Sequence, residues 1–365
     1  MGHDDSPPLR YGIVGSGMMG GEHILNLNEI DDAVVVAVAE PHEDARAWTQ
    51  ACLADRVDEV PIYDDHVTML REAELDAVVV ATPNFHHIEV LRDVMATELH
   101  VMCEKPLCTT VDDAVEARNL ARGRSALSWM GLEYRYMPTV ARFVEAVAAG
   151  ATGSLAMISI REHRFPFLTK IDNWNRFSAN TGGTLVEKCC HFFDLMRLVA
   201  QSDPVAVMAS GGQDVNHLDE HFDGRRSDIL DNAFVIVEFA SGVRAHLDLC
   251  MFAEGAPVEQ HLLAVGSEAR VESSVPGDRV EVQPRHGEVT GLEAPMWPEV
   301  TYEGFHHGSS FMEHLGFIEA IRSGTGPAVT FDDGLWAVAM GAAAHRSIDE
   351  GRRVTLEELG APWGS

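Results

Sequence analysis

Glu187, His191 and Asp194 are spaced so that one helix would carry an acid, a base and a second acid on a single stripe. They follow the glycine pair Gly182-Gly183, and intervals of four and then three residues match the 3.6-residue helical repeat. A histidine that titrates near neutral pH, set beside carboxylates, predicts general acid–base chemistry. The alternative is a half-buried helix on which a carboxylate merely satisfies the histidine.

Lysine is scarce in this chain, with only Lys105, Lys170 and Lys188 among 27 basic residues. An ammonium group is a compact charge that burial can tune, whereas guanidinium stays ionised. We therefore predict a function for Lys105 and Lys188, and we interpret Lys170 as chance retention.

A glycine-rich turn joins the first predicted strand, residues 9–14, to a predicted helix near residues 22–27. Such a turn lets a pyrophosphate approach the backbone N–H groups at a helix N-terminus. Glu40 ends the next predicted strand, where it would bind the adenosine ribose and repel a 2′-phosphate, which favours NAD over NADP. The cofactor residues predicted here are Gly15, Gly17, Met18, Met19, Gly20 and Glu40.

Two more loops follow strands of the same predicted sheet, after residues 76–80 and 100–103. Ligands bind at the carboxyl ends of strands in this architecture. Pro106 restricts the backbone of Lys105, which fixes the direction of this lysine toward the cleft. These loops add Thr82, Pro83, Asn84, His87, Glu104 and Lys105 to the predicted cofactor site.

Strands and helices alternate over residues 9–130, which predicts an α/β domain with a doubly wound parallel sheet. Over residues 131–365 strands follow one another with little helix between them, which predicts an α+β domain with a large mixed or antiparallel sheet. The last two helices could pack back on the first domain. Residues 1–8 read as a short flexible leader.

The composition excludes several classes of protein. A net charge of -30 argues against binding nucleic acid or an anionic membrane, and no apolar segment is long enough for a membrane span or a signal. Six cysteines without zinc spacing indicate reduced thiols in a cytoplasmic protein, and we expect no metal site. One face of the second sheet should be covered by another subunit, so a homodimer or homotetramer is expected.

With these motifs in order, the chain is similar to the Gfo/Idh/MocA oxidoreductase family, which includes glucose-fructose oxidoreductase and inositol dehydrogenase. The resemblance covers nearly all of the chain and implies an N-terminal Rossmann domain followed by an α+β substrate domain. It rests on the glycine turn, on Thr82-Pro83-Asn84 with His87, on Glu104-Lys105-Pro106, on the helix with Glu187, His191 and Asp194, and on His307-Gly308. Glu187 stands where the family usually has aspartate, and Cys189 where it has glycine.

The resemblance implies that His191 is the base, that Lys105 binds the same substrate oxygen, and that Glu187 orients neighbouring groups. An indole such as Trp174 could stack on a sugar ring, although it could equally close a hydrophobic loop. Basic residues around the predicted catalytic helix could recognise a carboxylate, phosphate or sulfonate on the sugar. The predicted substrate residues are Tyr134, Arg135, Arg164, Trp174, Arg176, Lys188 and His307.

The function implied is NAD-dependent oxidation of a hydroxyl group on a sugar, glycoside or cyclitol. One alternative is a redox-neutral glycosidase, which oxidises transiently, eliminates the aglycone and needs an extra base such as Tyr134, Tyr136 or His307. A second alternative is an NAD-sensing regulatory protein without turnover. That alternative predicts loss of the lysine or the histidine, and both are present.

Overall fold

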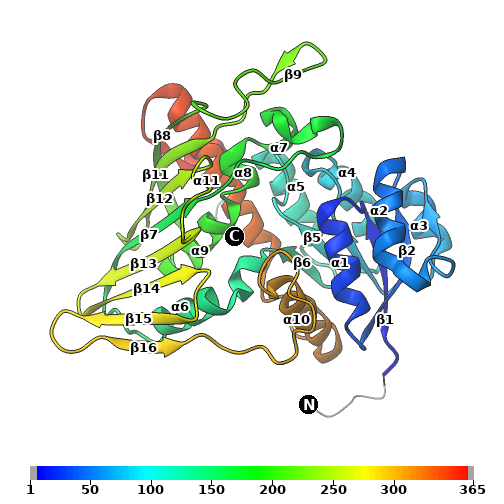
Figure 1. The fold of residues 1–365 in the computed structure, drawn as a ribbon, viewed down its shortest axis with the longest axis horizontal. Helices are drawn as coiled ribbons and strands as arrows, with labels where there is room; N and C mark the ends of the chain where they lie inside the picture. The colour runs from blue at the N-terminus through cyan, green and yellow to red at the C-terminus, as the bar shows by residue number, and fades with distance from the viewer. Residues whose placement is uncertain (1–5, 361–365) are drawn as a thin grey trace.

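The computed structural model describes residues 6–360, in which two sheets lie on either side of a layer of helices (Figure 1). The first sheet has six strands in the order β3-β2-β1-β4-β5-β6, and every neighbouring pair is parallel. Its strands are β1 (Leu9–Val14), β2 (Ala33–Ala39), β3 (Ile62–Tyr63), β4 (Ala77–Val80), β5 (His100–Glu104) and β6 (Ser128–Gly131). The predicted doubly wound parallel sheet is confirmed. The leader expected over residues 1–8 lies largely outside the described residues.

Short apolar strands build this sheet because both of its faces are covered by helices. The sequence of β2 is AVVVAVA and that of β4 is AVVV, and every residue of β4 is buried. The helices are α1 (Met18–Asn28), α2 (Glu43–Leu53), α3 (His66–Glu72), α4 (His87–Met95) and α5 (Val111–Ala121). Because all six strands are parallel, their carboxyl ends lie at the same edge of the sheet.

The second sheet has nine strands in the order β16-β15-β14-β13-β7-β12-β11-β8-β17. Strands β12 and β7 pair in parallel, whereas the other pairs are antiparallel, so the predicted mixed sheet is confirmed. The strands are β7 (Leu155–His163), β8 (Pro204–Gly212), β11 (Asn232–Phe239), β12 (Arg244–Cys250), β13 (Gln260–Gly266), β14 (Ala269–Val275), β15 (Arg279–Pro284), β16 (Thr290–Glu293) and β17 (Val354–Thr355). A separate pair of strands, β9 (His221–Phe222) and β10 (Arg225–Arg226), forms a small hairpin.

The single helix expected after Gly182-Gly183 is wrong, because the segment forms α8 (Thr184–Glu187) and α9 (Cys190–Ala200). Lys188 and Cys189 form a turn between the two helices. This turn brings the Lys188 side chain onto β7, where its Nζ lies 2.9 Å from Oε1 of Glu162. The three residues predicted to share one helical stripe are therefore divided between two helices.

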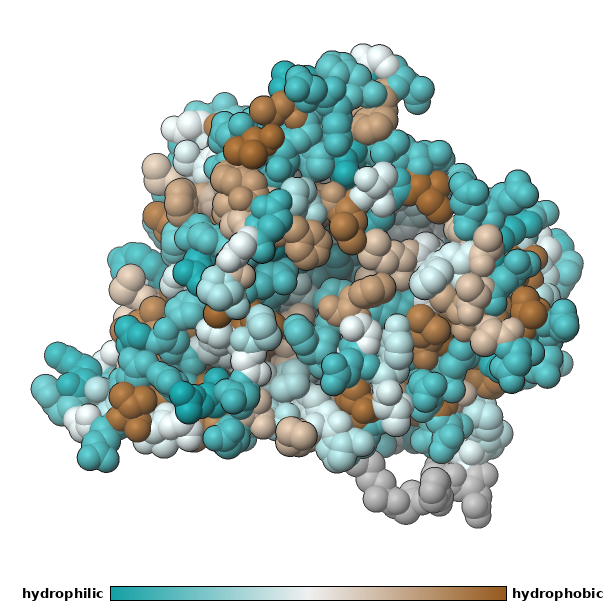
Figure 2. Space-filling model, in the orientation of Figure 1, coloured by the Kyte–Doolittle hydropathy of each residue, from teal (hydrophilic) through white to brown (hydrophobic). Residues whose placement is uncertain are grey.

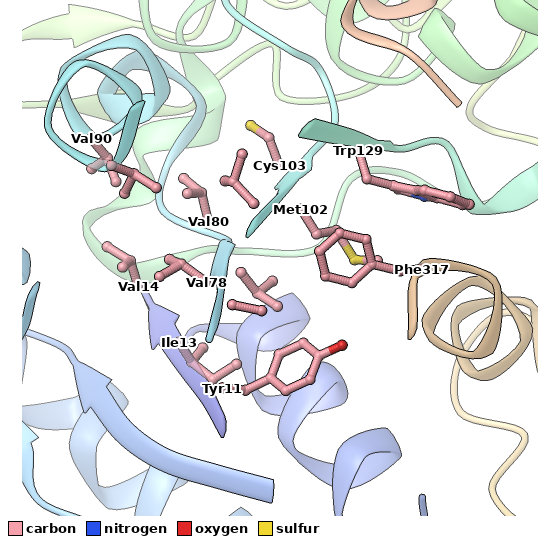
Figure 3. Packing of buried hydrophobic residues seen from close by; sticks show 14 of the residues in the cluster. Tyr11, Ile13, Val14, Val78, Val80, Val90, Met102, Cys103, Trp129 and Phe317 are labelled. Atoms are coloured by element: carbon pink, nitrogen blue, oxygen red, sulfur yellow. The ribbon is translucent and has the colours of Figure 1, made fainter. Parts of the chain in front are cut away.

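The last two helices join the two domains. α10 (Ser309–Ser323) packs against α1, and α11 (Phe331–Glu350) packs against α5, α8 and α9. Figure 3 shows Phe317 of α10 inside the core of the first domain, beside Met102 and Trp129. Helix α6 (Pro138–Ala148) covers the second sheet together with α9 and α11 (Figure 1). The two domains thus share packed helices along their interface.

The remaining physical properties are simple. All six cysteines are free thiols, and none of the helices in residues 6–360 is long and apolar enough to span a membrane. Hydrophilic side chains dominate the face of the molecule shown in Figure 2, in keeping with the large negative charge.

Candidate active site

A cleft of ≈ 660 Å³ opens at the carboxyl ends of β1, β2, β4 and β5. It is lined by ten of the residues predicted to bind a cofactor and by residues that arrive from the second domain. The ten are Gly15, Gly17, Met18, Met19, Glu40, Thr82, Pro83, Asn84, Glu104 and Lys105. Trp174 and Glu187 line the same cleft from the second domain. Tertiary folding thus brings one predicted catalytic acid to the predicted cofactor edge.

The glycine turn has the shape that a pyrophosphate requires. Gly15 has φ +82°, and a Cβ there would lie 2.7 Å from Cα of Thr82. At Gly17 a Cβ would meet no described atom within 4 Å, so it would project into open space. None of the described side chains caps α1, which begins at Met18, so its first N–H groups can bind an anion. The residues present therefore fit a dinucleotide.

Glu40 is a buried carboxylate at the end of β2. It accepts hydrogen bonds from the backbone N–H groups of Ser16, at 2.8 Å, and His42, at 2.8 Å. These bonds fix its negative charge beside the glycine turn. The nearby Arg46 forms an ion pair with Asp64, so a cation that could attract a 2′-phosphate already has a partner.

Gly20 and His87 support the cleft from behind. A Cβ at Gly20 would lie 2.0 Å from the carbonyl oxygen of Gly15, which explains why only glycine fits. His87 is buried, with Nδ1 2.9 Å from the carbonyl oxygen of Pro106 and Nε2 3.0 Å from that of Thr82. Burial lowers the pKa of His87 below its ordinary value. This histidine connects two cleft loops.

Glu104 is held by the first domain and orders the backbone of Lys105. Its Oε1 lies 2.9 Å from Nε2 of His23 on α1, and its Oε2 accepts the N–H of Lys105 at 3.1 Å. Burial alone would raise the pKa of Glu104, but the hydrogen bond and charge of His23 outweigh it and the pKa falls below its ordinary value. Glu104 is therefore an ionised anchor for the loop that carries Lys105.

Lys105, Lys170 and Glu187 meet in the cleft as two cations and one acid. Burial raises the pKa of Glu187 to about 7, although the two lysines oppose the shift. Within residues 6–360 its Oε2 is buried without a hydrogen-bond partner. Burial tends to lower the pKa of Lys105, but Cys190, Glu133 and Glu104 outweigh it and hold the pKa above its ordinary value.

Lys170 is the cleft residue that the sequence interpretation missed. It approaches from the segment between β7 and the short helix η4 (Ile171–Arg176), and its Nζ lies 3.9 Å from Sδ of Met18. Within the described chain it has no carboxylate partner in an ion pair, and burial lowers its pKa. The scarcity of lysine was the signal that could have identified it, since Lys105 and Lys188 were singled out on that basis.

His191 is buried and lies outside the residues that line this cleft. Its ring stacks on Tyr134, with centroids 3.9 Å apart, and its Nε2 lies 3.5 Å from Oε1 of Glu133. Burial holds the pKa of His191 well below its ordinary value, and the charges of Lys105 and Lys188 lower it further. Its Nδ1 has no hydrogen-bond partner in the described chain, so the neutral ring keeps a free nitrogen.

Lys188, Tyr134 and Arg164 form a connected group next to His191. Nζ of Lys188 donates a hydrogen bond to the Tyr134 hydroxyl at 2.7 Å. Oε1 of Glu162 contacts both Nζ of Lys188, at 2.9 Å, and the guanidinium of Arg164, at 3.3 Å. Burial raises the pKa of Tyr134 well above its ordinary value, so the phenol stays protonated. The negative charge of Glu162 offsets much of the positive charge of the two cations.

Arg135, Arg176 and His307 are placed away from a free binding position. Nε of Arg135 donates to Asp194 at 2.7 Å, which also removes Asp194 from the site. Nε of Arg176 donates to Glu220 at 2.9 Å, and its NH2 donates to the carbonyl of Phe167. His307 is exposed. All three side chains were predicted to bind substrate. Arg135 and Arg176 instead pair with acids that are distant in the sequence, and the loop that carries His307 leaves this side chain exposed.

Trp174 lines the cleft from η4 and contacts the first domain. Its ring lies edge-on to Phe85, with centroids 6.1 Å apart and an interplanar angle of 67°. Phe85 belongs to the short helix η2 (Asn84–His86), which follows β4. The indole therefore forms part of the cleft wall where the two domains meet.

Comparisons with known proteins agree with this arrangement. Residues 9–132 match a family model described as "Oxidoreductase family, NAD-binding Rossmann fold", and residues 144–356 match "Oxidoreductase family, C-terminal alpha/beta domain". Both models are those of the Gfo/Idh/MocA group.

Individual relatives extend over almost the whole chain. The myo-inositol 2-dehydrogenase of Thermotoga maritima is 27% identical over 353 residues, covering 96% of this chain and 99% of that protein. The inositol 2-dehydrogenase of Rhizobium meliloti is 24% identical, covering 95% and 99%. The structure of levoglucosan dehydrogenase in complex with NADH and levoglucosan has a TM-score of 0.83 at 19% identity, with 96% and 99% covered, a likeness of fold.

Proposed function

The chain belongs to the Gfo/Idh/MocA oxidoreductase family, and from that premise we propose that it is an NAD-dependent dehydrogenase of a neutral sugar, glycoside or cyclitol. The observation that carries this proposal is a single cleft that contains both a dinucleotide-shaped glycine turn and the pair Lys105 and Glu187. The relatives named for inositol support a cyclitol among these substrates.

The residues of this chain would handle the substrate oxygen and its proton. The carbinol carbon of the substrate would lose a hydride to the bound nicotinamide, which supplies that chemistry. Lys105, held ionised, would donate to the carbinol oxygen as negative charge develops on it. His191, a neutral imidazole with a free nitrogen, would take the hydroxyl proton, a role worth about 10²–10⁴ in rate. Glu187 would accept a hydrogen bond from a substrate hydroxyl.

A neutral substrate is favoured because the predicted anion receptors already have partners. Lys188 and Arg164 share Glu162, Arg176 pairs with Glu220, and Arg135 pairs with Asp194. Carboxylate oxygens of Glu133, Glu162 and Glu187 are among the buried acceptors that lack partners in the described chain. Such acceptors suit the hydroxyl groups of a polyol and repel a carboxylate, phosphate or sulfonate.

The test is NADH formation by absorbance with purified protein, NAD and a panel of neutral and anionic sugars, glycosides and cyclitols, with product analysis for each substrate. We expect NADH and a ketone with a neutral polyol, and loss of both in Lys105→Ala. Arg71→Ala is the control, because Arg71 is an exposed residue of α3 that does not line the cleft, and this variant should keep wild-type activity. A panel that yields no NADH with any polyol would contradict the proposal.

The glycosidase alternative requires an extra base, and the structure offers little support for one. The Tyr134 hydroxyl contacts Lys188 and its pKa is raised by burial, which also raises the pKa of Tyr136. His307 is exposed, and the neighbouring His306 faces Glu133 instead. Aglycone release with catalytic NAD and no net NADH would identify this chemistry in the same assay. Binding of NAD without any product would identify the NAD-sensing regulator.

For quaternary structure we propose a homo-oligomer formed through the outward face of the second sheet. That face carries exposed apolar side chains at Met208 on β8, at Phe234 and Ile236 on the adjacent β11, and at Met157 on β7, which β12 separates from β11. Met208 and Ile236 are directly paired across β8 and β11. Contiguous exposed apolar surface of this kind is typical of subunit contacts.

A further inference from the structure

Glu133 is a buried acid that no hydrogen bond explains. It opens the short helix η3 (Glu133–Tyr136) directly after β6, and its side chain is 1% exposed. Both of its carboxylate oxygens lack a hydrogen-bond partner within residues 6–360. Burying a carboxyl group without donors is costly, so such a group calls for a functional explanation.

Two histidines from distant segments flank the same oxygen of this acid. Oε1 of Glu133 lies 3.5 Å from Nε2 of His191 and 3.8 Å from Nε2 of His306. The ring of Tyr134 stacks on His191 and lies 5.9 Å from the ring of His306, so it holds both imidazoles in place. The side chain of His191 is 2% exposed and that of His306 is 22% exposed. His191, Glu133 and His306 thus lead from the buried base to solvent.

From this arrangement we infer that Glu133 and His306 form the path by which the substrate proton leaves His191 for water. The inference rests on the proposed dehydrogenase function. Oxidation of a carbinol to a ketone removes a hydride, which bound NAD would accept, and a proton, which must reach solvent. His191 would take the substrate proton at Nδ1 and give its Nε2 proton to the Glu133 carboxylate, Glu133 would pass a proton to His306, and His306 would release it to water. One proton leaves per turnover, and His191, left with its proton on Nδ1, returns to the Nε2 tautomer before the next cycle.

The geometry suits a carrier because Glu133 is free to turn. The contacts of Glu133 with His191 and with His306 are both longer than an ordinary hydrogen bond, but both lie within ion-pair distance. No described donor fixes the carboxyl group, so a small rotation can shorten the contact with either histidine in turn. A buried imidazole with a lowered pKa cannot keep a proton, which favours rapid transfer onward.

Charged groups from several elements act on Glu133. Burial raises its pKa above the ordinary value, while His306 and Lys105 oppose the shift and Glu104 adds to it. Burial thus makes the Glu133 carboxylate a stronger proton acceptor than an exposed glutamate. The titratable groups that surround the path are His191 on α9, His306 before α10, Glu104 and Lys105 at the end of β5, Glu313 on α10 and Glu22 on α1. Oε1 of Glu22 lies 3.7 Å from Nδ1 of His306.

The test compares Glu133→Gln and His306→Asn with wild type in polyol oxidation, at low buffer concentration and across pH. In both variants we expect kcat to fall about 10-fold or more and the solvent deuterium isotope effect on kcat to rise, because proton transfer becomes limiting. Added imidazole should restore His306→Asn, whose site reaches solvent, and should not restore Glu133→Gln. Affinity for NADH, measured by fluorescence, should remain that of wild type.

Glu313→Gln is the matched control, since Glu313 is an equally buried acid. Its Oε1 accepts a hydrogen bond from Nε1 of Trp129 at 3.2 Å. This variant should keep the wild-type isotope effect and buffer dependence. The path is overturned if wild type reduces NAD while both variants keep its rate, isotope effect and pH profile, or if Glu313→Gln reproduces their behaviour. A wild type that reduces no NAD with any polyol would instead overturn the proposed function.

Discussion

Nε2 of His23 lies 2.9 Å from the carboxylate of Glu104, and both side chains are buried. His23 stands on α1, which begins at the glycine turn, whereas Glu104 ends β5 and binds the N–H of Lys105. Nδ1 of His23 lies 2.9 Å from Nε2 of His314 on α10. One histidine thus links the cofactor-binding helix, the lysine loop and the interface helix.

His23→Gln should destabilise the fold by about 1–3 kcal/mol, because it disrupts the contact of a buried carboxylate with its imidazole partner. The pKa of Glu104 is lowered in the folded state, so this stabilisation is present above the ordinary glutamate pKa and is lost as pH falls through the lower folded value. Urea unfolding of both proteins between pH 7 and pH 3 measures it, and the difference should shrink on acidification.

The control is His66→Gln, which breaks a surface pair with Asp93. It should change stability by less than about 1 kcal/mol. Equal losses in the two variants would show that the buried link has no special role.

Glu187 should set the acidic limb of the pH–rate profile. Its pKa is raised to about 7 by burial, and only the ionised carboxylate accepts a hydrogen bond through both oxygens. The value of kcat/KM should therefore fall as pH drops below about 7. In Glu187→Gln the rate should be lower and this limb should disappear. A variant that retains the limb would show that another group titrates.

Lys170→Met should weaken NADH binding. The Lys170 ammonium lies beside Met18 without an ion-pair partner among residues 6–360, so it is placed to attract the pyrophosphate. The loss of one charge-assisted contact of about 1.5 kcal/mol raises Kd about tenfold. Fluorescence titration at low and high salt measures it, and the difference between the proteins should shrink at high salt. Arg71→Met removes a charge from an exposed position on α3, away from the cleft, and should leave Kd unchanged. An unchanged Kd in Lys170→Met would exclude this role.

Arg176→Ala should lower stability without changing substrate choice. The guanidinium is buried and bonds to Glu220 and to the carbonyl of Phe167, so its removal leaves those acceptors unpaired. Thermal unfolding should show a lower Tm. The ratio of kcat/KM for neutral and anionic sugars should match that of wild type, and a change in this ratio would restore Arg176 as an anion receptor.

Ile236→Asp should dissociate the proposed oligomer, since it places a charge among apolar side chains on the outward sheet face. Light scattering after size-exclusion chromatography reports the mass directly. Val289→Asp carries the same change at an exposed site between β15 and β16 and should leave the mass unchanged. A wild type with the mass of one chain would refute the proposal.

The sequence by itself determined the features that depend on local backbone chemistry. Alternating apolar strands and helices predicted the parallel sheet, because such strands can be stable only when covered on both faces. The turn at Gly15 requires a positive φ and a close approach to Thr82, which only glycine allows. The spacing of the glycines therefore predicted this turn. Loops after parallel strands share one edge, and Thr82, Glu104 and Lys105 from two such loops line one cleft.

Only the tertiary structure decided which charged groups remained free. Arg135 meets an acid 59 residues away and Arg176 one 44 residues away, and no local pattern encodes such partners. The helix is interrupted before α9, where Lys188 forms an ion pair with Glu162 of β7. The exposure of His307 likewise depends on how the loop before α10 packs against the rest of the chain. A side chain's charge and type are local properties, whereas its burial and its partner depend on long-range packing, and chemistry in a cleft requires both.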